Sequence, residues 1–66
     1  MPLDLSPRLA DPDGLFASLI HAHEGLDPAA SRRLDAAMVL LLANHIGDDQ
    51  VVREAISVAL SAEQPS

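Results

Sequence analysis

The side chains of this chain that could bind a metal ion or act in catalysis are first of all its three histidines, His21, His23 and His45. His21 and His23 belong to the string His-Ala-His-Glu, and on a helix two such residues point roughly 200° apart. They therefore cannot bind one ion together, and the His-Glu-x-x-His zinc motif is missing. We expect a solvated His21 that can share a helix face with Glu24. We expect His23 to be half-buried and hydrogen-bonded to a neighbouring turn.

His23 and His45 form the runner-up metal pair, because both fall on apolar stripes. In a helical hairpin the end of the first helix adjoins the start of the second, which puts His45 on the order of 25 Å from His23. A shared site would need a second chain or a different packing. We therefore predict no metal site, no cofactor and no catalytic residue, and we expect a protein that is not an enzyme. A small enzyme that acts as an oligomer stays open as an alternative, because an interface between chains can build a pocket. A histidine-based metal- or ligand-binding protein remains the alternative.

The elements that would position these side chains are three amphipathic or apolar runs, which predict an all-α fold without strands. The expected helices are Pro12–Glu24, Pro28–Ile46 and Asp49–Ala62. Each follows an aspartate suited to an N-cap, and glycines separate the helices. The predicted organisation is a flexible N-terminal arm over residues 1–10, a three-helix domain over residues 11–62 and a disordered tail over residues 63–66.

The second expected helix contains an unbroken apolar run, Ala36–Ala43, so it needs cover on every side. One face carries Leu34, Met38, Leu41, Leu42 and His45, and a hairpin partner would cover it. A second face carries Ala36, Val39, Ala43 and Ile46, and the third helix would cover part of it. Leu40 lies on a third side, between Arg33 and Asn44, where we expect a monomer to leave it exposed.

The sequence thus predicts a small three-helix bundle, a helical hairpin plus a third helix, packed against a second chain. The predicted interface consists of Met38, Val39, Leu40, Ala43, Asn44, His45 and Asp48. The junction Asn44–Asp48 has two interpretations. It caps the two adjoining helices, or it also forms a polar contact patch for a partner.

Composition excludes several classes of partner. The chain has 66 residues, a formal net charge of −6, four arginines, no lysine and one aromatic side chain, Phe16. Such a chain lacks the basic patch that nucleic acids require, and it lacks attraction for anionic membranes. No apolar run reaches the roughly 20 residues of a membrane span. Without cysteines and without a visible signal peptide, we expect a cytoplasmic protein.

Two motifs resemble those of a known family. Ala-His-x-Gly-Leu occupies Ala22–Leu26, and Leu-Leu-Leu-Ala-Asn-His-Ile-Gly-Asp occupies Leu40–Asp48. Together they resemble a family of very small bacterial proteins classed as a domain of unknown function, over roughly residues 10–60. The family implies no activity. The resemblance implies companions of flavin-dependent aromatic hydroxylases or of other catabolic enzymes.

The predicted function is that of a non-enzymatic helical interaction module. Its partner is either further copies of itself, giving a homo-oligomer, or a larger enzyme of which it is a small accessory subunit. Three features support both possibilities. They are the apolar surface of the second helix that the chain cannot cover, the excess of acidic over basic residues, and the small size of the chain. Nucleic acids and membranes are not expected partners.

Overall fold

The computed structural model describes residues 3–64 and shows three α-helices in this part of the chain, with no strand. They are α1 (Pro12–His23), α2 (Pro28–Ile46) and α3 (Asp49–Glu63). This confirms the predicted all-α, three-helix fold. The first two residues of the predicted arm and residues 65–66 of the predicted tail lie outside the described residues.

Aspartates begin all three helices, as expected from their position in the sequence. The carboxylates of Asp11, Asp27 and Asp48 accept hydrogen bonds from backbone N–H groups of the first helical turn, at distances from 2.8 to 3.3 Å. These N–H groups have no partner within the helix, so the caps satisfy them. Proline follows the first two caps at a position where no backbone donor is needed.

The helix ends differ slightly from the prediction. The first helix ends at His23 rather than Glu24, because Glu24 has extended backbone angles (φ −61°, ψ 134°). The third helix includes Glu63, which the prediction assigned to the tail. Gly25 and Gly47 have φ values of 77° and 71°, the left-handed conformation that glycine adopts at low cost.

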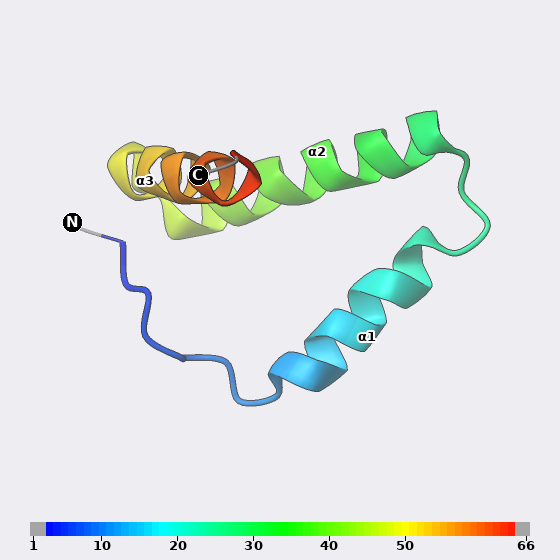
Figure 1. The fold of residues 1–66 in the computed structure, drawn as a ribbon, viewed down its shortest axis with the longest axis horizontal. Coiled ribbons are helices and arrows are strands. Elements are labelled where there is room, and N and C mark those ends of the chain that lie inside the picture. The colour runs from blue at the N-terminus through cyan, green and yellow to red at the C-terminus, as the bar shows by residue number, and fades with distance from the viewer. Residues whose placement is uncertain (1–2, 65–66) are drawn as a thin grey trace.

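The three helices enclose little space between them. The third helix packs against the C-terminal half of α2, whereas α1 diverges from α2 beyond the turn that joins them (Figure 1). The N-terminal segment returns towards α3, where the Leu3 backbone N–H donates to the Glu54 carboxylate at 2.6 Å. The radius of gyration is 13.5 Å, compared with about 11 Å for a compact domain of this length.

The described residues contain no buried side chain, either apolar or polar. The most sheltered positions, such as Leu19, Leu34 and Met38, are only half-buried. A folded domain normally derives most of its stability from fully buried apolar side chains. The described part of the chain therefore has no fully buried core.

Candidate protein-interaction surface

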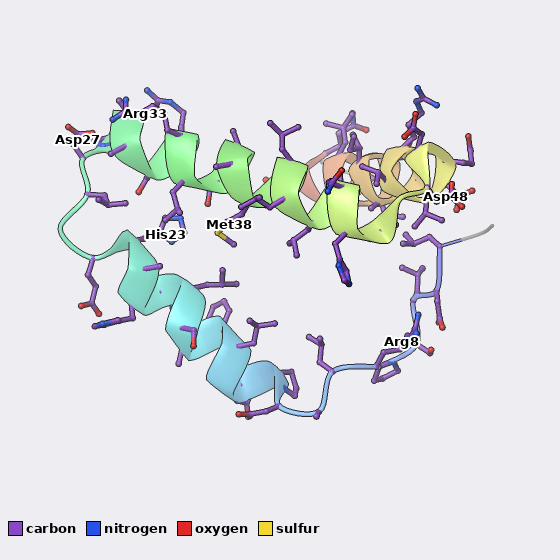
Figure 2. The ribbon with its side chains drawn as sticks, turned by 180° about the vertical axis from the view of Figure 1, so that it is seen from behind. Arg8, His23, Asp27, Arg33, Met38 and Asp48 are labelled. Atoms are coloured by element: carbon purple, nitrogen blue, oxygen red, sulfur yellow. The ribbon has the colours of Figure 1, made fainter. Side chains whose placement is uncertain are left out.

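The predicted interface residues lie on α2 and at the N-cap of α3, but they do not form one face. At about 100° per residue, Leu40 and Asn44 align along one side of α2, because they are four residues apart. Asp48 follows the end of this helix and is the N-cap of α3. Met38 and His45 lie on another side, and Met38 points towards α1 in Figure 2. The remaining two, Val39 and Ala43, share a third side. The predicted set therefore includes residues from three sides of one helix.

Leu40 has 71% of its surface exposed, in agreement with the expectation that a monomer leaves it uncovered. Leu41 is exposed to the same extent, although the sequence analysis assigned it to the face covered by the hairpin partner. That expectation is corrected for the C-terminal half of the face, where Leu42 and His45 are exposed as well. The reason is geometric, because α1 is shorter than α2 and diverges from it.

Leu41 is thus an interface candidate that sequence reasoning missed. The spacing of Leu41 in the sequence indicates that it lies near the Leu40 side of α2, since it follows Ala37 by four residues and Arg33 by eight. Both positions belong to the side of α2 that Leu40 occupies. A helix stripe wide enough to include residues i, i+4, i+7 and i+8 would have placed Leu40 and Leu41 together.

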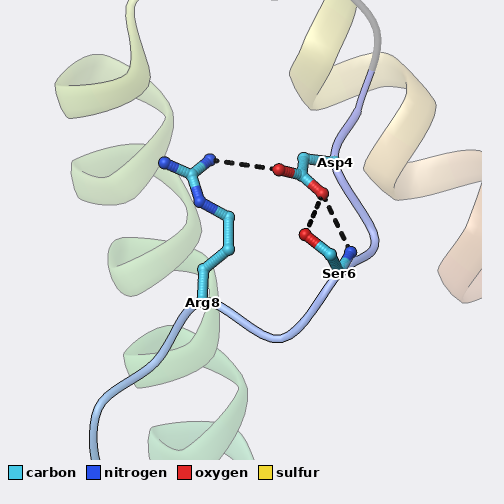
Figure 3. A network of polar contacts seen from close by, with 3 residues as sticks. All are labelled: Asp4, Ser6 and Arg8. Carbon is cyan, nitrogen blue, oxygen red and sulfur yellow. Dashed lines mark hydrogen bonds and ion pairs between the residues drawn. The ribbon is translucent and has the colours of Figure 1, made fainter.

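The arm adds apolar surface to that of the helices. Asp4 accepts hydrogen bonds from the backbone N–H and the hydroxyl of Ser6, and its other carboxylate oxygen lies 3.8 Å from the Arg8 guanidinium (Figure 3). These contacts, the Ser6 hydroxyl first, lower the pKa of Asp4. The turn that they stabilise leaves Leu5 and Leu9 largely exposed. The arm therefore adds two exposed leucines to the apolar surface of the described residues.

His23 makes the best-defined polar contact between α1 and α2. Its Nδ1 lies 2.7 Å from the Leu19 carbonyl oxygen, and its Nε2 lies 2.7 Å from an oxygen of Asp35 on α2. Figure 2 shows His23 at the end of α1, between this helix and α2. Both partners are acceptors, so both ring nitrogens can donate only in the imidazolium form. The Leu19 carbonyl first, and then the Asp35 carboxylate, raise the pKa of His23, with partial desolvation opposing them. The expected half-buried, hydrogen-bonded histidine is confirmed, with 29% of its side chain exposed.

The contacts of His23 predict how stability depends on pH. Because folding raises the pKa of His23, the stabilisation is complete below about pH 6.5 and is lost as the pH rises through the folded-state pKa. Thermal unfolding between about pH 6 and 8.5 should show this loss in the wild type and not in His23→Gln. The exposed His21 provides the matched control, so His21→Gln should keep the dependence. An identical pH profile for wild type and His23→Gln would contradict the assignment.

The other histidines have different surroundings. The Nδ1 atom of His21 lies 3.3 Å from the Glu24 carboxylate, and both side chains are mostly exposed, as expected for this pair. His45 lies in the last turn of α2, at the opposite end of that helix from the turn near His23. Within residues 3–64, no three potential metal ligands of the His, Cys, Asp or Glu type come together. Protein acceptors occupy both ring nitrogens of His23, so binding a metal would require breaking one of these contacts.

The fold and the surface define a small all-α protein whose helices carry exposed apolar sides. The chain matches the family described as Protein of unknown function (DUF2783) over residues 3–61, and it therefore belongs to that family. This confirms the expected membership in a family of unknown function. No curated protein and no solved structure matches the chain. None of the described helices combines the length and hydropathy needed to cross a membrane.

Proposed function

We propose that this protein acts by binding another protein chain through the exposed apolar sides of its helices, without catalytic activity of its own. The partner is a further copy of the chain or a larger protein to which it is an accessory subunit. The observation that supports the proposal most strongly is the lack of any buried side chain among residues 3–64. Large exposed apolar surfaces on a small protein are typical of interaction sites.

The surface area supports the same proposal. The chain has 5774 Å² of accessible surface, whereas a compact monomer of 7.0 kDa has about 4,000 Å². The surplus of roughly 1,800 Å² exceeds the roughly 800 Å² that each partner buries in an interface of standard size. Chains in obligate complexes bury areas of this larger kind, and their interfaces resemble a domain core divided between two chains.

The polar groups fit binding better than catalysis. A catalytic acid or base acts in a site that excludes water and that a second group supports. Here His23 is engaged in joining α1 to α2, and the exposed His45 has no comparable surroundings. Asn44 and His45 follow the exposed leucines of α2 at helical spacing, which is the arrangement expected of a polar rim around an apolar contact.

If the partner is not a further copy of the chain, the family resemblance suggests which kind of protein it is. It points to a larger catabolic enzyme, such as a flavin-dependent one. In that case the surplus apolar surface would be covered by the enzyme, and the small chain would stabilise or position part of it. The exposed leucines of α2 and of the arm are the surfaces available to such an enzyme.

The native mass of the protein tests the proposal. We expect a mass above that of one chain for the protein in host extract, and also for the purified protein if its partner is a further copy. The exposed Leu40 supplies the control, since Leu40→Asp puts a charge into the apolar contact and should reduce the assembly. A single-chain mass in both samples would contradict the proposal. So would turnover by the isolated protein that Asn44→Ala or His45→Ala abolishes.

A further inference from the structure

One polar contact between side chains joins α1 to α2 in the part of the chain that the structure describes, and we call the two residues that form it the latch. They are His23 at the end of α1 and Asp35 on α2, whose side chains meet at 2.7 Å. The other ring nitrogen of His23 contacts the Leu19 carbonyl oxygen of its own helix, so contacts on both sides fix the ring. The latch lies at the end of α2 that carries Arg33, opposite the end that leads to Asp48 (Figure 2).

Apolar packing adds little to hold α1 in this position. Leu19 is the one large apolar side chain of α1 that is half-buried, and the others are exposed. On α2, the side chains of Leu34 and Met38 are half-buried four residues apart, and Met38 points towards α1 in Figure 2. Segments with few buried apolar contacts open at a small cost in free energy. The polar contact of the latch therefore has a large share in holding the two helices together.

The turn between the two helices has the properties of a hinge. It comprises residues 24–27, all of which are exposed. Gly25 has φ at 77°, and nothing lies within 4 Å of the position that a Cβ atom would take there. Hinges are formed by a few loop residues that change their backbone angles without meeting other groups. The first helix is therefore free to turn relative to α2 about residues 24–27 once the latch is broken.

The latch requires a proton on His23. Both groups that face the ring are acceptors, namely the Leu19 carbonyl oxygen and the Asp35 carboxylate. An imidazolium donates to both, whereas a neutral imidazole has one N–H and leaves a nitrogen lone pair against an oxygen 2.7 Å away. Loss of the proton also removes the charge attraction to Asp35. The arrangement in the structure is therefore that of the protonated histidine.

We propose that His23 and Asp35 form a pH-dependent latch, which holds α1 against α2 when His23 is protonated and releases α1 when His23 is neutral. Released α1 turns about residues 24–27, and Leu34 and Met38 lose the cover that α1 provides. The latch acts within one chain, so it goes beyond the proposed function and does not depend on which protein the chain binds. Because the Leu19 carbonyl and Asp35 raise the pKa of His23, the latch opens with a midpoint above about pH 6.5.

The other charged groups around the turn have different surroundings. On the side of α1, His21 lies against Glu24 at 3.3 Å, and both are mostly exposed. On the side of α2, the Asp27 carboxylate caps the helix, and Arg33 lies on the side away from α1 in Figure 2. Arg32 makes no ion pair within residues 3–64. Both α3 and the N-terminal segment lie at the far end of α2 (Figure 1). Asp35 is therefore the charged group that controls the latch.

The distance between two spin labels tests the latch in the intact protein. The chain has no cysteine, so Ala17→Cys on α1 and Ala37→Cys on α2, both at exposed positions, place the labels. A large excess of unlabelled chains removes distances between different chains. We expect one narrow distance at about pH 5.5, and at least a twofold smaller share of chains at this distance at about pH 8.5. Equal distance distributions at the two pH values would overturn the proposal.

Substitutions assign the effect to the two residues of the latch. His23→Gln should abolish the pH dependence, because glutamine does not titrate, whereas the matched control His21→Gln should keep it. Asp35→Asn should move the midpoint to lower pH, because it removes the carboxylate that favours the imidazolium. This second variant tests the latch without any change at His23 itself. An unchanged midpoint in Asp35→Asn, or loss of the pH dependence in His21→Gln, would contradict the proposal.

Two further measurements distinguish release of α1 from unfolding of the chain. Circular dichroism well below the melting temperature should show the same helix content at both pH values, since the aspartate caps of the helices do not involve His23. In an NMR titration, the pKa of His23 should equal the midpoint of the distance change. Helix loss in parallel with the distance change, or a midpoint that follows the pKa of His21 instead, would reject the latch. The native mass tests the proposed function separately, and a single-chain mass would reject that function without affecting the latch.

Discussion

The melting temperature of the protein is expected to rise with protein concentration, by about 5 °C for each tenfold increase. A tenfold increase in concentration favours a two-chain assembly by about 1.4 kcal/mol. The expected shift follows from the entropy of unfolding of two 66-residue chains together. The physical reason is that no described side chain is buried in the single chain, so folding and association should be one process.

Circular dichroism over a hundredfold range of concentration measures this effect. The wild type should lose helix at lower temperature as it is diluted. The variant Leu40→Asp should have less helix than the wild type at every concentration, because a charge at this exposed position weakens the association on which folding depends. A melting temperature of the wild type that stays constant on dilution would show that the single chain is stable alone.

Replacement of Gly47 by alanine is expected to destabilise the protein by about 1–2 kcal/mol. Gly47 ends α2 with φ at 71°, and its backbone N–H donates to the Ala43 carbonyl at 2.9 Å. A Cβ atom at this position would meet only the Asn44 carbonyl oxygen, at an ordinary distance of 3.9 Å. The cost therefore comes from the left-handed backbone conformation and not from a steric clash.

The melting temperature at one fixed concentration measures this cost, and we expect Gly47→Ala to lower it by roughly 7–14 °C. Gly47→Asn is the matched control, because asparagine tolerates the left-handed conformation better than alanine. It should melt between the wild type and Gly47→Ala. Equal melting of Gly47→Ala and the wild type would mean that the turn between α2 and α3 can change its conformation without cost.

The sequence alone was sufficient to predict where all three helices begin. Asp11, Asp27 and Asp48 act through hydrogen bonds to residues two or three positions further along the chain, so neighbouring residues alone decide them. The glycine turns were predictable for the same reason. The helix ends were less so, because whether Glu24 continues a helix depends on weak local preferences that contacts elsewhere readily override.

The candidate surface was only partly predictable. Leu40 was expected to be exposed because neither neighbouring helix could reach its side of α2. Leu41 was expected to be covered, since the periodicity placed it beside residues that face α1. Periodicity gives the direction of a side chain around its own helix, but it does not state how far a neighbouring helix extends.

What the sequence determined by itself was the set of helices, their caps, and an apolar surplus on the second helix. Only the tertiary structure decided that α1 diverges from α2, that His23 joins them through Asp35, and that Leu3 binds Glu54. The physical reason is the range of the interactions. Caps and turns depend on residues within one turn, whereas burial depends on which surfaces distant segments bring together, and in this chain they bring together too little to bury any described side chain.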